Sequence, residues 1–240
     1  YLAADIGLAE AKRNERVDAI YPLTLNQQGI YLSSVLNPDT YQNSFGVYFD
    51  IPLDVNVDLL KQAYCELVAE QSVLRISLKE SNQVYLDLAY QIVNRGKKAN
   101  IESVDWSALG LTENEITSRV EDFIFRKYNI EGELVYCQII KIFDERYIVA
   151  LACHHIVFDG IGLMSLFNAL KDRYEKNSDG INVPVWQDRF GDYVMYERNH
   201  ADIAGIQGFW KKVLPSTLTP VAIDPVLEIK DEAQSKAKAS

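Results

Sequence analysis

Apolar and polar residues alternate along the chain with two different periods. Every second residue from 45 to 51 is apolar, which predicts a strand with one buried face. Apolar residues recur three or four positions apart in 23–36 and in 57–71, which predicts two helices, with Thr24 as the N-cap of the first. Residues 1–20 are polar and Ala-rich and show neither period, so we expect a linker or a short surface helix there.

Two longer apolar runs, 134–143 and 146–152, are separated by Asp144-Glu145. They predict a hairpin of two central strands. A second strand pair is expected at 74–78 and 84–93. The remaining periodic segments predict a short strand at 104–106 and helices at 112–127, 161–174, 186–200 and 205–214.

Strands and helices therefore alternate irregularly, with hairpins beside helices. This order favours an α+β fold, a mixed sheet with packed helices, over a regular series of parallel units. The 240 residues are enough for one large domain or two small ones. Glycine-rich phosphate loops and the Gly-x-Ser-x-Gly elbow are absent from the sequence.

Composition narrows the class of partner. The net charge is −10, from 24 basic and 34 acidic residues, which argues against nucleic acid and does not favour an anionic membrane surface. No apolar run reaches the length of a membrane span, and no signal peptide pattern is present. We expect a cytoplasmic protein and, because the chain does not begin with Met, a piece of a longer one. Cys65, Cys137 and Cys153 are expected to be buried free thiols.

The segment with the most candidate catalytic side chains is residues 154–160, His-His-Ile-Val-Phe-Asp-Gly. It follows the second apolar run of the predicted hairpin. Histidine exchanges a proton near neutral pH, so one imidazole could act as a base toward an attacking amine or hydroxyl. Adjacent residues of a strand point to opposite sides, so only one of the two can face a given cleft. Asp159 could cap the following helix or pair with an arginine. Gly160 would allow close approach of backbone or substrate, or a positive φ.

Structural and metal-binding roles remain open as alternatives for these residues. The His pair could be structural, or His154, His155 and Asp159 could hold a metal, although no second His cluster supports a metal site. Arg75 lies in an apolar stretch, where it would need an acidic partner such as Asp159, or would be an exposed strand residue. His200 is expected to be solvated. Six aromatic residues are expected to pack helix against helix: Trp186, Phe190, Tyr193, Tyr196, Phe209 and Trp210.

His-His-x-x-x-Asp-Gly at 154–160 resembles the signature of the condensation domains of nonribosomal peptide synthetases and of their chloramphenicol acetyltransferase-like relatives. Three further segments resemble other motifs of the same family and occur in the same order along the chain. Tyr-Pro-Leu-Thr-Leu-Asn-Gln-Gln-Gly-Ile-Tyr at 21–31 resembles the opening motif, Val-Leu-Arg at 73–75 the end of the second, and Phe-Trp-Lys at 209–211 a later segment. The resemblance covers about residues 18–215.

The resemblance implies a chloramphenicol acetyltransferase-like lobe, one of two that enclose a tunnel. Phosphopantetheine arms of donor and acceptor carrier domains would enter it, and an amine on one arm would attack a thioester on the other. No cofactor or metal would bind directly. His155 would be catalytic and His154 would shape the loop, while Asp159 would be structural, salt-bridged to Arg75, and Gly160 would line the tunnel. Partners would be the carrier domains, a C-terminal lobe and adjacent synthetase modules, with neither nucleic acid nor membrane.

The sequence departs from this pattern in length and in the second motif. The resemblance implies a linker at 1–17, an N-terminal lobe at 18–222, and at 223–240 a tail or the start of a link to a missing C-terminal lobe. Glu70-Gln71-Ser72 stands where the family often has Arg-His-Glu, and Gly162 where Ser is frequent. We expect the piece to fold but to condense poorly alone. Epimerisation, ester formation, CoA-dependent acyl transfer and a non-catalytic carrier-binding module are the alternatives.

Overall fold

The computed structural model describes residues 16–51, 54–81, 88–143, 146–180, 187–215 and 217. The chain divides into two units, residues 1–200 and 201–240, which are described separately. The first unit holds two sheets and most of the helices, and the second holds one helix among its described residues.

The larger sheet is mixed, as the sequence predicts, with the strand order β2-β7-β6-β5. Its central pair, β6 and β7, is the expected antiparallel hairpin, although the predicted turn at 144–145 lies outside the described residues. β2 pairs antiparallel with β7 and sets Ser44 opposite His154, while β5 runs parallel to β6. The strands are β2 Ser44–Ile51, β5 Ile101–Asp105, β6 Val135–Lys141 and β7 Tyr147–His154.

The smaller sheet is antiparallel, with the order β1-β4-β3. Its first strand corrects the last part of the prediction of a linker or helix at 1–20, because Val17–Pro22 forms β1, whereas residues 1–15 lie outside the described residues. The pattern missed β1 because its partner is the distant β4 (Ala89–Asn94). The strand expected at 74–78 begins instead with a 3₁₀ turn, η1 (Ser72–Arg75), and β3 follows as Ile76–Glu80.

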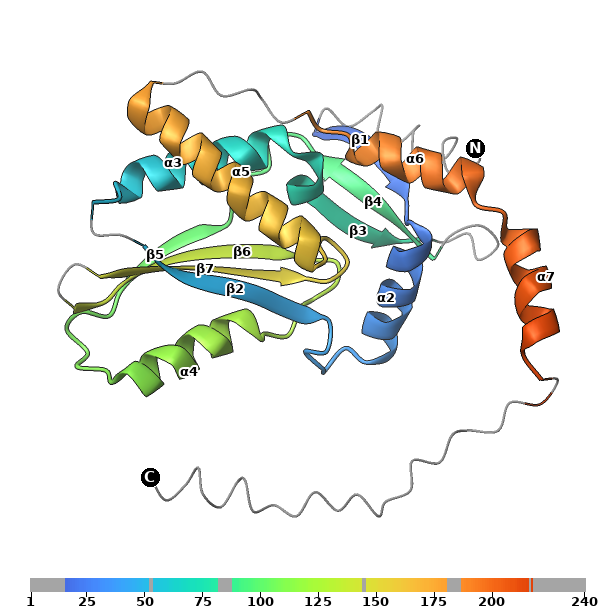
Figure 1. Ribbon diagram of the computed structural model, residues 1–240, viewed down its shortest axis with the longest axis horizontal. Helices are drawn as coiled ribbons and strands as arrows, with labels where there is room; N and C mark the ends of the chain where they lie inside the picture. Colours follow the sequence, from blue (N-terminus) through green and yellow to red (C-terminus); the bar gives the residue numbers. More distant parts are fainter. Residues whose placement is uncertain are drawn as a thin grey trace, which may run out of the picture. The chain divides into compact units, whose positions relative to one another are not determined.

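Helices cover both faces of the larger sheet (Figure 1). α3 (Val57–Glu70) and α5 (Gly160–Asp179) pack on one face, where Leu67 and Leu163 join a core with strand residues such as Leu151. α4 (Glu113–Ile124) packs its apolar side on the opposite face. Adjacent residues of β7 therefore enter different cores, so a side chain at its end faces only one of them.

Local capping signals fix several helix starts. Thr24 caps α2 (Leu25–Leu36) in a reciprocal capping box with Gln27, and Thr112 caps α4 in the same way with Glu115. Asn56 caps α3. Each of these helices starts within a few residues of its predicted position, because the cap and the apolar spacing lie in the same short segment.

The buried guanidinium of Arg173 joins α3 and α5, the two helices that share one face of the larger sheet. Arg173 of α5 is 5% exposed and donates to Glu70 of α3 at 2.8 and 2.5 Å and to Glu66 at 3.3 Å. This pairing gives Glu70, a departure from the family's second motif, a structural partner. Burying an arginine is tolerated here because two carboxylates accept from it.

Among the six aromatic residues expected to pack helix against helix, Phe190 is half-buried and packs edge to face on Tyr21 of β1, with ring centroids 6.2 Å apart. Tyr193 and Tyr196 on α6 (Phe190–His200) are exposed, as are Phe209 and Trp210 on α7 (Ile203–Val213), the helix of the second unit. Trp186 lies outside the described residues. None of the described helices is both long and apolar enough to cross a bilayer.

The three cysteine thiols differ in exposure: two are buried and one is exposed. Cys137 and Cys153 are buried and free, as predicted, and burial raises the pKa of each to about 12. Cys65 is exposed, which corrects its prediction, because it falls on the outer side of α3.

Candidate active site

The candidate site forms where β7 passes into α5. β7 ends at His154, residues 155–157 form a turn, and α5 begins at Gly160. This short connection holds four of the five residues singled out in the sequence: His154, His155, Asp159 and Gly160. The fifth, Arg75, lies on η1.

His154 is buried, with 3% of its surface exposed, and both of its ring nitrogens are engaged. Its Nδ1 accepts the backbone N–H of Ile156 at 3.1 Å, so the proton of the neutral ring lies on Nε2. Nε2 lies 3.1 Å from the Ser34 hydroxyl of α2. That hydroxyl also accepts from Asn43 at 2.8 Å and donates to the Ile30 carbonyl at 2.8 Å. His154 therefore ties the loop to α2.

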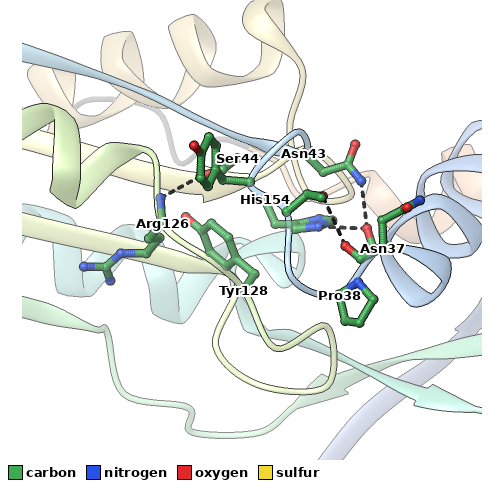
Figure 2. Close-up of a pocket in the computed structure, with 10 residues that line it drawn as sticks. Asn37, Pro38, Asn43, Ser44, Arg126, Tyr128 and His154 are labelled. Atoms are coloured by element: carbon green, nitrogen blue, oxygen red, sulfur yellow. Dashed lines mark hydrogen bonds between the residues drawn. The ribbon is translucent and has the colours of Figure 1, made fainter.

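The neutral form of His154 is favoured by its surroundings. Burial, and secondarily the charge of His155, lower the pKa of His154 to about 4. A small cavity of about 10 Å³ lies on this buried side, lined by Tyr128, Arg126 and Asn43 among others (Figure 2). Room of that size is on the order of one water molecule, so His154 faces no substrate-sized space there.

His155 is half-buried, and its side chain has different neighbours from that of His154. Its imidazole stacks on the phenyl ring of Phe45, and its backbone N–H donates to the Asn43 carbonyl at 2.8 Å. Within the described part of the chain, no group hydrogen-bonds to the His155 ring. The opposite orientations of the two imidazoles confirm what the alternation of a strand predicts.

The turn itself is anchored by a buried glutamine. Gln27 of α2 donates to the Ile156 carbonyl and to Gln91 Oε1, both at 2.9 Å. Gln91 donates back to Gln27 at 2.7 Å and to the Pro22 carbonyl at 2.9 Å. The segment at 21–31 thus holds the loop of the His pair, a contact that joins residues more than a hundred positions apart.

Asp159 is an exposed helix cap. Its carboxylate accepts the N–H of Gly162 at 2.7 Å and so satisfies a free donor at the start of α5. Gly160 does not have a positive φ, and a Cβ placed there would meet nothing within 4 Å. Neither a positive φ nor a close backbone neighbour therefore explains Gly160, and room for substrate stays a prediction.

The expected ion pair between Arg75 and Asp159 is wrong. Arg75 is buried, as predicted, but its guanidinium pairs with Asp18 of β1 and donates to the Asn94 carbonyl at 3.0 Å. Asp18 also accepts from Arg95 at 2.6 Å. These bonds, first from Arg95 and then from Arg75, hold the pKa of Asp18 below its usual value. Arg75 therefore fastens the smaller sheet and not the loop.

The metal interpretation has no geometric support. Both nitrogens of His154 are already bonded, and Asp159 is engaged with its own helix. In the described ranges, no group of three or more His, Cys, Asp or Glu side chains could hold a metal ion. His200 is exposed, as predicted, and its Nδ1 lies 2.9 Å from the Tyr196 carbonyl.

Comparison with known proteins gives the same family as the site residues. The family model of the condensation domain matches residues 17–239. The dimodular nonribosomal peptide synthase of Bacillus subtilis (strain 168) is 26% identical over 230 residues, covering 89% of this chain and 9% of that protein. Polyketide synthase PksN of the same organism is 23% identical over 224 residues, covering 90% of this chain and 4% of that protein.

Solved structures agree on the fold. The starter condensation domain of rhizomide synthetase RzmA matches with a TM-score of 0.71 and 17% identity, over 84% of this chain and 51% of that one. The first condensation domain of the calcium-dependent antibiotic synthetase, in complex with a substrate analogue, matches with a TM-score of 0.67 and 17% identity, over 84% and 50%. The chain thus spans about half the length of these solved domains and less than a tenth of the curated synthetases.

The chain belongs to the condensation domain family of peptide and polyketide synthetases. Its fold is the chloramphenicol acetyltransferase-like fold that the signature implies. Members of this family are enzymes of the acyltransferase type in nonribosomal peptide synthesis.

Proposed function

We propose that this chain supplies the histidine-bearing half of a site that forms an amide between two carrier-bound substrates. The observation that carries the proposal is the difference between the two imidazoles. His154 is buried and fully bonded, whereas His155 is half-buried, with a ring that no described group hydrogen-bonds. The more accessible ring is the one that could meet a substrate.

In the proposed reaction, the amine nitrogen on the acceptor arm attacks the thioester carbonyl carbon on the donor arm. The C–N bond forms, the C–S bond breaks, and the donor arm leaves as a thiol. His155 accepts the proton that the amine loses and returns it to the leaving sulfur, or it holds the amine in position while that proton passes to the sulfur, and either role raises the rate. The stacked Phe45 ring would keep the imidazole in one orientation, and the bond to the Asn43 carbonyl would hold the main chain of His155.

The partners follow from the same proposal. Donor and acceptor carrier domains would bring phosphopantetheine arms, and a C-terminal lobe would complete the tunnel, because the chain covers only about half of each solved domain it resembles. Adjacent synthetase modules would lie on either side, in the cytoplasm. The 240 residues alone would then condense slowly or not at all.

Intact-mass spectrometry of the acceptor carrier tests this function. An aminoacyl donor carrier and an aminoacyl acceptor carrier are mixed with the complete synthetase or with the 240-residue chain. We expect the acceptor to gain the donor acyl mass only with the complete synthetase, and the control variant His200→Ala of that synthetase to give the same yield.

Three outcomes would contradict the proposal. Full turnover by the 240-residue chain would show that no second lobe is needed. Equal transfer from a soluble acyl-CoA would indicate a carrier-independent acyltransferase. Carrier binding without transfer in any assembly would indicate a non-catalytic binding module.

A further inference from the structure

An apolar cavity lies at the end of β2 that is farthest from His155. It encloses about 300 Å³ between the last residues of β2, the start of α3 and the second half of α5. Leu60, Val149 and Leu170 contribute buried side chains to its wall, and Phe49 and Phe167 contribute half-buried ones. The two phenylalanines stack on each other, with ring centroids 4.0 Å apart.

The cavity has the size and lining of a binding site. Ligand sites in proteins commonly start at about 300 Å³ and are lined mainly by apolar side chains. An apolar cavity of about half this volume stays dry and takes up benzene in an engineered protein. Protein interiors otherwise pack densely, so an apolar group that fills this space gains contacts that the empty protein lacks.

Charges at the rim are paired with each other. Asp50 accepts from Arg146 at 2.7 Å, and Lys171 lies 3.8 Å from Glu175 on the same helix. The Tyr174 hydroxyl accepts the N–H of Asn56 at 2.9 Å. A charged ligand would therefore find no unpaired counter-ion among these lining residues, and it would lose its hydration on entry.

The cavity is separate from the candidate active site. Phe45 and Ile51 lie six residues apart on β2, and at about 3.3 Å per residue that is roughly 20 Å. Ile51 lines the cavity, whereas Phe45 contacts His155.

We propose that this cavity binds a small uncharged aliphatic molecule with a chain of about six carbons. The site does not depend on the condensation reaction, since it lies on the 240-residue chain and at the opposite end of β2. Filling it would brace β2 against α3 and α5 and would stabilise the folded state, because the ligand binds the folded chain alone.

Methyl NMR of the 240-residue chain with 1-hexanol as the probe tests the site. We expect saturable shifts at the methyl groups of Ile51, Val55, Leu60, Val149 and Leu170, and none at Ile116 or Ile140 on the opposite face of the sheet. The melting temperature should rise with hexanol over the same concentration range. Hexanoate should bind at least tenfold more weakly, because its carboxylate would have to leave water.

Two matched variants sharpen the test. Val55→Phe places a larger side chain in the cavity and should weaken hexanol binding at least tenfold, whereas Val57→Phe, outside the lining, should leave it unchanged. Shifts spread evenly over both faces, the absence of saturation, or equal binding by the two variants would overturn the proposal. If Val55→Phe does not fold, the map of shifts in the unaltered chain still decides, because unshifted cavity methyls would contradict it.

Discussion

The phenyl ring of Phe45 lies face to face with the imidazole of His155, with ring centroids 3.9 Å apart and planes 12° from parallel. Phe45 belongs to the edge strand β2 and pairs with Cys153 of β7, so the register of the two strands sets this stack. The stack covers one face of the imidazole and leaves the nitrogens at its edge. An aromatic pair of this kind contributes about 0.5–1.5 kcal/mol.

The stack predicts a positioning role for Phe45. Phe45→Leu keeps an apolar side chain but loses the flat face, so the imidazole should sample several orientations. We expect kcat of condensation in the complete synthetase to fall roughly tenfold or more, because small displacements of reacting groups cost rate steeply. KM for the loaded carriers should change little.

Matched variants separate positioning from folding. Phe45→Tyr keeps the stack and should restore most of the rate. Tyr48→Leu removes an exposed aromatic ring from the same strand and should leave kcat unchanged. Equal rates for Phe45→Leu and Tyr48→Leu would show that the stack does not position His155.

The ion pair of Arg75 predicts a coupling that a double-mutant cycle measures by urea unfolding. Substituting alanine for Arg75 and Asp18 should reveal an interaction of roughly 1.5–3 kcal/mol, the range for hydrogen bonds to charged groups. The cycle of Arg75 with Asp159 should give a value near zero. A larger coupling with Asp159 than with Asp18 would restore the pairing that the family resemblance implies.

The cap formed by Asp159 gives an independent prediction. Asp159→Ala should lower the free energy of unfolding by about 1 kcal/mol, because the N–H of Gly162 loses its partner. Asp159→Asn keeps a capping oxygen and should cost much less. Equal losses for the two variants would mean that the charge of Asp159, and not its cap, matters.

The lowered pKa of His154 predicts a pH dependence of folding. Its pKa is about 4 in the folded chain against 6.5 for an ordinary histidine, so between these values the unfolded chain binds the extra proton. The free energy of unfolding should therefore fall as pH drops from 6.5 to 4, by roughly 2–3 kcal/mol from this group. His154→Gln should be less stable at pH 7 but flatter over this window, whereas His200→Gln should follow the unaltered chain. Parallel curves for all three proteins would show that His154 is not the group that titrates.

The sequence predicted those structural features that depend on residues close together in the chain. The capping boxes at Thr24 and Thr112, the β6–β7 hairpin and the opposite orientations of His154 and His155 follow from signals within a few residues. Contacts between distant segments could not be read in this way. Asp18 becomes the partner of Arg75 only when β1 pairs with β4, and a segment without periodicity gave no sign of that strand.

The supporting residues of the site show the same limit. Gln27 stood in a recognised motif, yet its bond to the Ile156 carbonyl depends on where α2 meets the loop. Phe45 was predicted as one residue of an amphipathic strand, and its stack on His155 depends on the β2–β7 register. Ser34 and Asn43 carried no signal in the sequence beyond their polarity.

The most direct test of the account is the single-turnover rate of amide formation by the complete synthetase with alanine at position 155. His155→Ala should lower the rate constant at least 100-fold, within the range of about 10²–10⁴ for a lost general base, while the free energy of unfolding falls by no more than about 1.5 kcal/mol, the loss expected from the stack on Phe45. A rate constant within threefold of the unaltered enzyme would contradict the claim that this imidazole takes part in the reaction.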